Sequence, residues 1–257
     1  RGLGDVYKRQ ILYNKTEVYC SAVHRFGSDA LLLARFCEPR RSQKAADLCS
    51  GCGIVSLEWH DRGHRGPCAA VELQPEASAL LQEAVAAQGI EHITPYLTDL
   101  RTFREGEGQF DVCACNPPYF TAGPQSTDAG RATARHETDC TLEDVCACGF
   151  RLLKDGGKLV VVSPSPRHLF ELKEVLYEKP YENKPNVYGL NKFDESEEMI
   201  FEYPVVLESQ EDILNLFTMT PYYYKTSAEA VEKLKKVNRL ELTCGFSIRT
   251  FTKKRGF

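Results

Sequence analysis

Blocks of apolar residues alternate with amphipathic blocks along the first half of the chain, and this pattern predicts strands and helices in turn. The segments 54–62 and 75–89 carry apolar residues at helical spacing, and Gly89 closes the second of them. Short apolar runs flank these two helices, and each has the length of a buried strand. The predicted strands are 45–49, 67–73, 93–100 and 110–115. Strands that alternate with helices predict a parallel sheet with right-handed crossovers.

The second half of the chain continues the alternation. Residues 142–153 predict a helix that ends at the turn 154–157, and 158–164 predict a fifth strand. Further elements are predicted as helices at 168–176, 211–217 and 227–237 and as strands at 199–207 and 242–252. The pattern therefore predicts an α/β protein with helices packed on a large sheet.

The predicted strand 110–115 ends at the sequence NPPY, which is Asn116, Pro117, Pro118 and Tyr119. Prolines cannot donate backbone hydrogen bonds to a sheet, so the strand stops and a rigid turn follows. An amino group on a flat ring or amide is a poor nucleophile, because its lone pair is delocalised. The carbonyl oxygens of Asn116 and Pro117 can accept its hydrogens, and Tyr119 can stack on the ring, a contact worth ~1–3 kcal/mol. A stiff loop without a chemical role is the alternative.

The sequence DLCSGCG, from Asp47 to Gly53, links the first predicted strand to its helix. Gly51 and Gly53 let the backbone approach a ligand closely, and Glu72 has the spacing of a carboxylate that accepts ribose hydroxyls. The dinucleotide motif G-x-G-x-x-G is absent, because Ser56 stands in place of its third glycine. The loop therefore favours a nucleoside ligand without phosphate, such as S-adenosylmethionine.

The third predicted strand leads to Asp99, which adds an acidic side chain to the sheet edge of Asp47 and Glu72. Ligands of open α/β sheets bind outside the carboxyl ends of the strands, where Asp99 can accept a hydrogen bond from an adenine amino group. A helix N-cap or a turn aspartate is the alternative role. We also count Leu73 and Leu100, which neighbour Glu72 and Asp99, among the cofactor-binding candidates.

Composition narrows the class of protein. The 257 residues are 42% hydrophobic and 26% charged with a net charge of −4, as in a soluble globular protein without a uniformly basic surface. No apolar run reaches the roughly 18 residues of a membrane helix, and no signal peptide is apparent. Several of the 11 cysteines stand in apolar runs, and Cys49 and Cys52 have C-x-x-C spacing without a second such pair. We expect free thiols in a cytoplasmic protein and no bound metal.

Two anomalies divide the chain. Residues 1–10 start with Arg and have no apolar period, so we interpret them as a non-native leader, with a disordered native tail as the alternative. Near residue 166 the composition changes, because 13 Arg and 5 Lys precede it whereas 4 Arg and 10 Lys follow. Such a change marks a domain boundary or a junction between two genes. The predicted organisation is a leader at 1–10, a cofactor-binding catalytic core at 11–165 and a C-terminal part at 166–257.

Several motifs resemble known enzymes. DLCSGCG, VEL and NPPY resemble class I S-adenosylmethionine-dependent methyltransferases. HRFGSDALLLARF (24–36), RATARHE (131–137) and LEDVCACGFRLLKDGGKLVVV (142–162) narrow the resemblance to the tRNA1(Val) (adenine(37)-N6)-methyltransferase family over about residues 11–165. The resemblance implies an α/β fold with a class I Rossmann-like sheet, mostly parallel with an antiparallel last strand, and S-adenosylmethionine as cofactor.

The resemblance also implies roles for the segment that precedes the predicted helix 30–36. In that family the segment around Phe26 to Leu33 closes over the cofactor, which makes Gly27, Ser28 and Asp29 cofactor-binding candidates. An N-cap for the helix is the alternative. Cys49 departs from the family pattern, since many methyltransferases have a glycine there, and we expect its small side chain to fit.

Two further regions bear on the substrate. Arg131, Arg135 and His136 follow a Gly/Ser/Thr-rich stretch and are candidates for contact with RNA phosphates, with a solvated charged face as the alternative. From about residue 166 the chain resembles the C-terminal part of the 23S rRNA (guanine-N1)-methyltransferase family, through PRHLFELKEVLYEKPYENK and LFTMTPYYYKTS. We therefore expect a chimera in which residues 166–257 have a different origin and still complete the sheet.

The leading hypothesis is methyl transfer from S-adenosylmethionine to the exocyclic N6 amine of an adenine in tRNA, in the cytoplasm. A 23S rRNA guanine-N1 methyltransferase is disfavoured by NPPY, because a ring nitrogen that loses its proton needs no pair of amine acceptors. A protein glutamine N-methyltransferase also uses NPPY but usually carries an N-terminal helical module. A non-catalytic chimera is the remaining alternative. The oligomeric state is left open.

Overall fold

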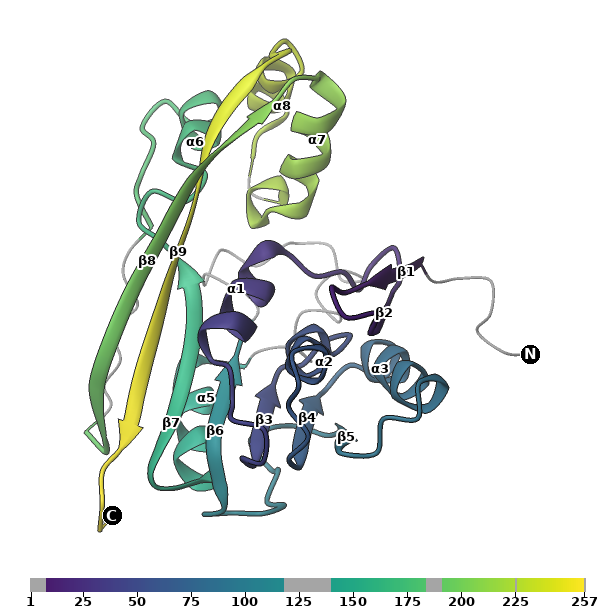
Figure 1. Cartoon of the computed structure of the whole chain (residues 1–257). Helices are drawn as coiled ribbons and strands as arrows, with labels where there is room; N and C mark the ends of the chain where they lie inside the picture. Colours follow the sequence, from purple (N-terminus) through teal and green to yellow (C-terminus); the bar gives the residue numbers. More distant parts are fainter. Residues whose placement is uncertain (1–7, 118–139, 184–190, 225, 257) are drawn as a thin grey trace.

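The computed structural model describes residues 8–117, 140–183, 191–224 and 226–256 (Figure 1). They form a seven-stranded sheet with the strand order β5-β4-β3-β6-β7-β9-β8, and a separate two-stranded hairpin. The strands of the large sheet are β3 (Ala45–Leu48), β4 (Cys68–Glu72), β5 (Ile93–Leu97), β6 (Phe110–Cys115), β7 (Leu153–Pro164), β8 (Phe193–Leu207) and β9 (Leu240–Lys253).

The pairing directions match the predicted fold class. β3 to β7 pair in parallel, whereas β9 runs antiparallel to both β7 and β8. The prediction of an α/β sheet that is mostly parallel, with an antiparallel last strand, is confirmed. β9 lies between β7 and β8 and pairs with β7 from Lys158 to Pro164. The C-terminal part of the chain is thus built into the sheet and does not form a separate unit beside it.

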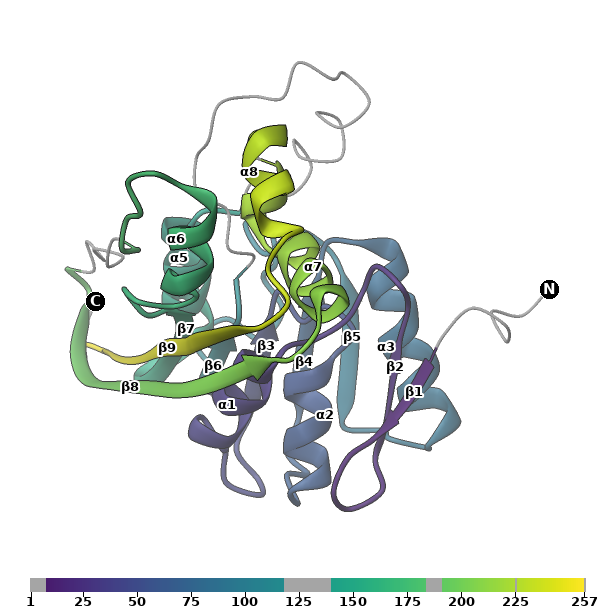
Figure 2. The same cartoon turned by 90° about the horizontal axis from the view of Figure 1, so that it is seen from above.

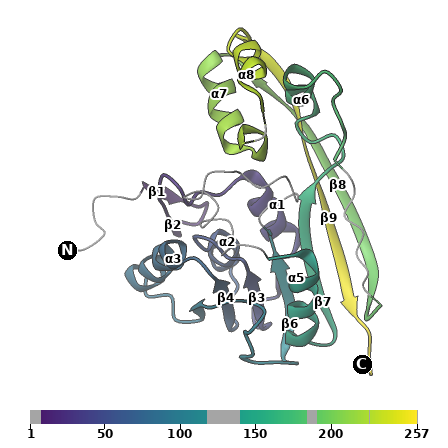
Figure 3. The same cartoon turned by 180° about the vertical axis from the view of Figure 1, so that it is seen from behind.

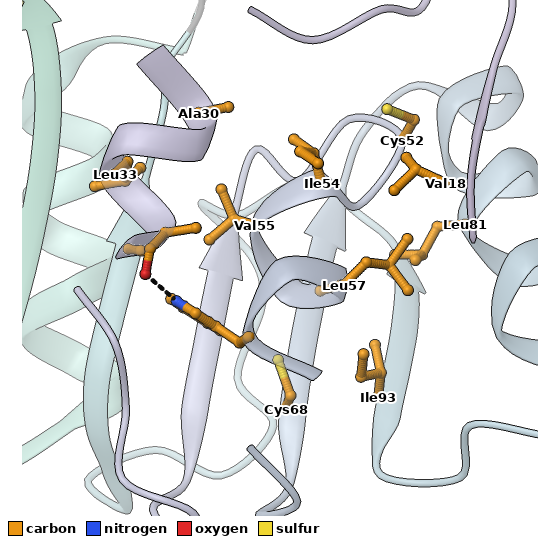
Figure 4. Packing of buried hydrophobic residues seen from close by; sticks show 14 of the residues in the cluster. Val18, Ala30, Leu33, Cys52, Ile54, Val55, Leu57, Cys68, Leu81 and Ile93 are labelled. Carbon is orange, nitrogen blue, oxygen red and sulfur yellow. Dashed lines mark hydrogen bonds between the residues drawn. The ribbon is translucent and has the colours of Figure 1, made fainter. Parts of the chain in front are cut away.

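Helices cover both faces of the parallel strands, as Figures 1 and 3 show. They are α1 (Ser28–Phe36), α2 (Ile54–Asp61), α3 (Pro75–Ala87) and α5 (Leu142–Leu152). α1, α2 and α3 form one apolar core with the sheet, and α5 forms a second core on the opposite face. Figure 4 shows Leu33 of α1, Leu57 of α2 and Leu81 of α3 in the first core. There the indole Nε1 of Trp59 donates a hydrogen bond of 3.0 Å to the Ala34 carbonyl oxygen, which links α2 to α1. Because successive strand residues enter opposite cores, the central strands have no polar face.

The chain after β7 adds a second group of helices beyond the end of the sheet (Figures 1 and 2). These are α6 (Phe170–Leu176), α7 (Gln210–Met219), the 3-10 helix η1 (Pro221–Tyr224) and α8 (Ala228–Leu234). Their apolar side chains form a third cluster, which includes Leu172, Phe217 and Leu234. β8 and β9, the longest strands of the sheet, extend beyond it to this second group of helices, which we call the C-terminal lobe. They attach the lobe to the sheet.

A hairpin that the sequence pattern did not predict precedes the sheet. β1 (Lys8–Ile11) pairs antiparallel with β2 (Glu17–Cys20), so residues 8–10 of the predicted leader belong to a strand. The carboxylate of Asp61 on α2 accepts a hydrogen bond of 2.8 Å from the Asn14 backbone N–H and holds the hairpin against the core. All four residues of β1 are exposed, which explains why its sequence carries no apolar period.

Some element boundaries also differ from the prediction. β5 ends at Leu97, so residues 98–100 lie in a turn and not in the strand. Residues 154–157 were expected to form a turn before the fifth strand, yet they belong to β7. The pairing of β7 with β6 shifts at this place, so the extra residues form a bulge, and Gly156 supplies a φ of 76°.

The eleven cysteines all lie in the described residues, and all are free thiols, eight of them buried. Burial raises the pKa of the Cys146 and Cys148 thiols to about 12 and about 11, so both are protonated at neutral pH. Among the described residues no three His, Cys, Asp or Glu side chains are grouped so that they could hold a metal ion. The eight buried cysteines therefore act as small apolar core residues.

In the same parts of the chain, no helix has the length and apolar character needed to span a membrane.

Phe251 tests whether the C-terminal part folds together with the core. This β9 residue is 1% exposed and packs in the core that α5 covers. Phe251→Ala is expected to destabilise the protein by ~3–5 kcal/mol, because it empties space that both parts of the chain share. Urea unfolding followed by the fluorescence of Trp59, the single tryptophan, measures the effect.

The control is Ile200→Ala on the neighbouring strand β8, where the side chain is 54% exposed and a change of only ~0.5 kcal/mol is expected. An unchanged Trp59 transition in Phe251→Ala would show that the two parts unfold independently.

Candidate active site

A cavity of about 250 Å³ opens at the carboxyl edge of the sheet. Its walls come from the loop after β3, the segment that leads into α1 and the residues that follow β6. The predicted site residues that line it are Gly27, Asp29, Asp47, Cys49, Gly51, Asn116 and Pro117. Ligands of open α/β sheets bind at this edge, so the structure brings the two predicted motifs together at the expected place.

The loop after β3 takes left-handed backbone conformations at Cys49, Gly51 and Gly53, with φ of 57°, 55° and 81°. This conformation costs a residue with a Cβ roughly 1–2 kcal/mol, so Cys49 occupies a position that favours glycine. A Cβ added to Gly51 would meet no atom within 4 Å, whereas one on Gly53 would lie 2.3 Å from the Leu81 side chain. Gly51 therefore leaves room for a ligand, and Gly53 allows α2 to pack against α3.

Asp47 lies at the base of the cavity with 1% exposure, and its carboxylate accepts a hydrogen bond of 3.1 Å from the Ser56 N–H. Burial raises the pKa of Asp47 to about 7, and the bond from Ser56 offsets only part of that effect. In the described part of the chain the charged group that acts on Asp47 is Glu72, another acid, which raises the pKa further and is not a counter-ion. A buried acid without a counter-ion is suited to a positively charged ligand.

Glu72 supports the loop from the end of β4. Its two oxygens accept hydrogen bonds of 2.7 Å from the N–H groups of Gly51 and Gln74. Glu72 is 7% exposed and is not among the residues that line the cavity. Each carboxylate oxygen keeps a second lone pair, so the contact with ribose hydroxyls stays a prediction. Leu73, the next residue, is 38% exposed and accessible to a ligand.

Asp99 has the turn role that we considered as its alternative. Its carboxylate binds the Arg101 guanidinium, with an Nη2–Oδ2 distance of 2.6 Å, and accepts the Arg101 backbone N–H at 2.8 Å. The bond from the Arg101 side chain lowers the pKa of Asp99. Neither Asp99 nor Leu100 lines the cavity, and the Leu100 side chain is buried in the core under α5. Their contacts with a cofactor stay predictions.

Residues at the N-terminus of α1 also line the cavity. The N-cap of α1 is Gly27 and makes no side-chain cap bond, so Ser28 and Asp29 do not act as N-caps. The Ser28 hydroxyl lies 2.7 Å from the Tyr203 hydroxyl on β8, and Ser28 does not line the cavity. Asp29 lines it and accepts a hydrogen bond of 2.9 Å from Nδ2 of Asn116. The N-terminus of α1 and the NPPY sequence are therefore linked directly by a hydrogen bond.

Asn116 and Pro117 reach the cavity from the end of β6. The predicted residues that lie outside the described parts of the chain are Pro118, Tyr119, Arg131, Arg135 and His136. Their roles in ring stacking and RNA contact stay predictions.

Two residues with useful chemistry were missed by the sequence analysis. Ser50 is 5% exposed, lines the cavity, and its hydroxyl has no hydrogen-bond partner among the described residues. Arg25 lines the cavity next to Phe26 and carries a positive charge. Ser50 stands in DLCSGCG, which was interpreted through its glycines, and Arg25 stands in HRFGSDALLLARF, which was noted for its family resemblance. A polar side chain between small loop residues was the available signal for Ser50, and a cation before Phe26 was the signal for Arg25.

The sheet order, the acids at successive strand ends and the Asn-Pro turn after β6 are the features of a class I methyltransferase fold. Residues 9–184 match the methyltransferase small domain family, and the chain belongs to that family.

Two curated relatives show which methyltransferases the chain is similar to. A tRNA1(Val) (adenine(37)-N6)-methyltransferase from Aeromonas hydrophila is 31% identical over 144 residues, which cover 55% of this chain and 60% of the relative. An enzyme of the same name from Parabacteroides distasonis is 28% identical over 154 residues, which cover 59% of this chain and 62% of the relative. The chain thus spans about three fifths of the length of the curated relatives that it matches.

Solved structures share the fold at low sequence identity. The YcgJ protein from Bacillus subtilis superimposes with a TM-score of 0.58 at 12% identity, over 89% of this chain and 99% of that protein. A geranyl diphosphate methyltransferase, solved in complex with S-adenosylmethionine, has a TM-score of 0.51 at 14% identity, over 88% of this chain and 84% of that enzyme. These similarities confirm the class I Rossmann-like fold.

Asp47 provides a test of the site's electrostatics. Its pKa of about 7 lies above the ordinary value of 3.8, so the folded chain holds the proton more tightly than the unfolded chain. The ionised carboxyl therefore costs stability as the pH rises through this interval. Asp47→Asn is expected to raise stability at about pH 8 by ~1 kcal/mol or more, roughly 2–4 °C for a chain of this size, and to have less effect at about pH 5.

Thermal unfolding at the two pH values measures this difference. Asp155→Asn, at an exposed position, is the control and is expected to leave the unfolding temperature nearly unchanged. A gain from Asp47→Asn that is equal at both pH values would contradict a buried carboxyl with a raised pKa.

Proposed function

We propose that the protein is an S-adenosylmethionine-dependent methyltransferase that modifies the exocyclic N6 amine of an adenine in tRNA. The observation that carries the proposal is the position of Asn116 and Pro117 on the wall of the cavity that the loop after β3 also lines. Membership of the methyltransferase small domain family supports the reaction class. The names of the relatives from Aeromonas and Parabacteroides support adenine N6 of a tRNA as the target.

The residues of the cavity fit this cofactor. S-adenosylmethionine carries a sulfonium and an ammonium, both of which suit the buried Asp47, and a carboxylate, which suits Arg25. The hydroxyl of Ser50, which has no partner among the described residues, offers a further hydrogen bond, and the open space beside Gly51 admits the ligand. Glu72 is the proposed acceptor for the ribose hydroxyls. The charges of Asp47 and Arg25 and the hydroxyl of Ser50 thus complement the groups of this cofactor.

When bound, S-adenosylmethionine supplies an electrophilic methyl group, whose bond to sulfur breaks as the bond to the substrate nitrogen forms, and the extra proton of the nitrogen passes to water. The carbonyl oxygens of Asn116 and Pro117 accept the amine hydrogens and direct the nitrogen lone pair. Tyr119 is the proposed stacking residue for the base. These groups act by orientation, which contributes ~7–11 kcal/mol at best, and no strong general base is needed.

The C-terminal part bears on whether the substrate is a tRNA or an rRNA. The family match ends at residue 184, so most of the chain after β7 lies outside it. We propose that residues 11–165 form the catalytic core, that residues 166–257 have a different origin, and that the enzyme acts in the cytoplasm, where its tRNA substrate is found. A transfer to rRNA, as the resemblance of the C-terminal part implies, is the competing outcome of the test.

Product analysis tests the proposal. The full chain is incubated with S-adenosylmethionine and unmodified tRNA, 23S rRNA or a release factor, and the products are digested and identified by mass spectrometry. We expect N6-methyladenosine from tRNA alone. 1-Methylguanosine from rRNA or N-methylglutamine from protein would overturn the proposed substrate. No product, combined with no thermal shift on addition of S-adenosylmethionine, would overturn the proposed reaction.

Asn116→Ala tests the amine acceptor. We expect the rate of methyl transfer to fall by roughly 100-fold or more, because the substrate nitrogen loses an orienting bond, while the Kd for S-adenosylmethionine stays nearly unchanged. Single-turnover kinetics and calorimetry measure the two quantities. Asn215→Ala on the exposed face of α7 is the matched control. Persistent transfer by Asn116→Ala would exclude the acceptor role.

A further inference from the structure

The hydrogen bond between Asn116 and Asp29 joins two segments that are 87 residues apart. Asn116 follows the rigid end of β6, and Asp29 lies in the first turn of α1. Asp29 is 9% exposed, and both residues line the cavity. The N–H groups and the dipole at a helix N-terminus favour an acidic side chain in the first turn. The carboxylate is therefore stabilised by its own helix while it accepts from Asn116.

Gly27 provides the space that this carboxylate occupies. A Cβ added at position 27 would lie 2.4 Å from Oδ1 of Asp29. The φ of Gly27 is −102°, which any residue adopts, so backbone conformation does not require glycine there. Close packing against Asp29 is the reason for the glycine. Two independent features, the bond to Asn116 and the missing side chain at position 27, thus define one position of the carboxylate.

This position decides which way the Asn116 amide points. An asparagine side chain has a nitrogen that donates and an oxygen that accepts, and the two can exchange places by rotation. A carboxylate oxygen accepts, so the nitrogen of Asn116 faces Asp29 and the carbonyl oxygen is turned to the other side. Rotation of the amide would place two oxygens against each other.

We propose that Asp29 is a positioning residue, which holds the Asn116 amide in the orientation that offers its carbonyl oxygen to the substrate amine. The role differs from the cofactor contact that the family resemblance implied for Asp29. It rests on the proposed function, since an amine acceptor has a purpose only in an N-methyltransferase. Asp29 acts through Asn116 and needs no contact with the substrate.

Kinetics separate this role from cofactor binding. Asp29→Asn keeps the size of the side chain but lets the two amides pair in either orientation, so we expect kcat to fall about 10- to 100-fold while the Kd for S-adenosylmethionine changes by less than about threefold. Glu211→Gln, an exposed acid in the first turn of α7, makes the same chemical change away from the cavity and should leave both constants unchanged. A Kd that weakens in step with kcat would overturn the proposal.

A double-mutant cycle tests the part of Gly27. Gly27→Ala should lower kcat as Asp29→Asn does, because the new Cβ displaces the carboxylate from Asn116. In the background of Asp29→Ala no carboxylate remains, so adding Gly27→Ala should cause no further loss. Losses that multiply would overturn the proposal. Thermal unfolding of each variant, compared with the wild type, shows that the measured chain is folded.

An NMR measurement that needs no catalytic turnover distinguishes a failure of the role proposed for Asp29 from a failure of the proposed function. The side-chain amide signals of Asn116 in a heteronuclear NMR spectrum are assigned by their loss in Asn116→Ala. They should shift in Asp29→Ala and remain in place in Glu211→Gln. If the wild type methylates no substrate, the proposed function fails, but a shift confined to Asp29→Ala still supports the Asp29–Asn116 contact. Signals that do not respond to Asp29→Ala would overturn it.

Discussion

Burial of the parallel strands on both faces is the constraint on which the rest of the structure depends. β3 and β6 send alternate side chains into two apolar cores, so no polar residue is tolerated along their length without a partner. Polar chemistry is thereby confined to the strand ends. Asp47, Glu72 and Asn116 stand in the last positions of three neighbouring strands or directly after them, and all three come to one edge. The candidate site is a consequence of how the sheet is covered.

The same constraint explains how the C-terminal part fits. β7 would expose an open edge without β9, and β9 supplies Ile248 to one core and Phe251 to the other. The hydroxyl contact between Ser28 and Tyr203 extends this integration to the residue next to Asp29. Whatever the origin of residues 166–257, their alternating pattern matches the faces of the sheet that they complete. A change in composition along a chain therefore does not imply a separate folding unit.

The sequence was a good guide wherever local pattern decides the outcome, and a poor one where distant contacts decide it. The central strands and Asn116 were placed correctly, because glycine and proline mark the ends of apolar runs. Residues 154–157 were misplaced because a Gly-Gly turn and a bulge have the same composition. Ser28 and Asp29 depend on partners 175 and 87 residues away, which no local pattern contains. The family resemblance suggested that these two residues lie near the site, and the structure shows which residues they contact.

Three energetically costly features lie together around the cavity, whereas a buried charge in another part of the chain is satisfied. In the C-terminal lobe, Lys173 is fully buried, yet its ammonium donates to the Tyr181 carbonyl oxygen at 3.0 Å and is satisfied. In the cavity, Asp47 has a raised pKa, the hydroxyl of Ser50 lacks a partner among the described residues, and Cys49 adopts a backbone conformation that favours glycine. Each feature costs on the order of 1–3 kcal/mol. A ligand bound in the cavity would hydrogen-bond to Ser50 and pair with the carboxylate of Asp47, and would so recover part of these costs.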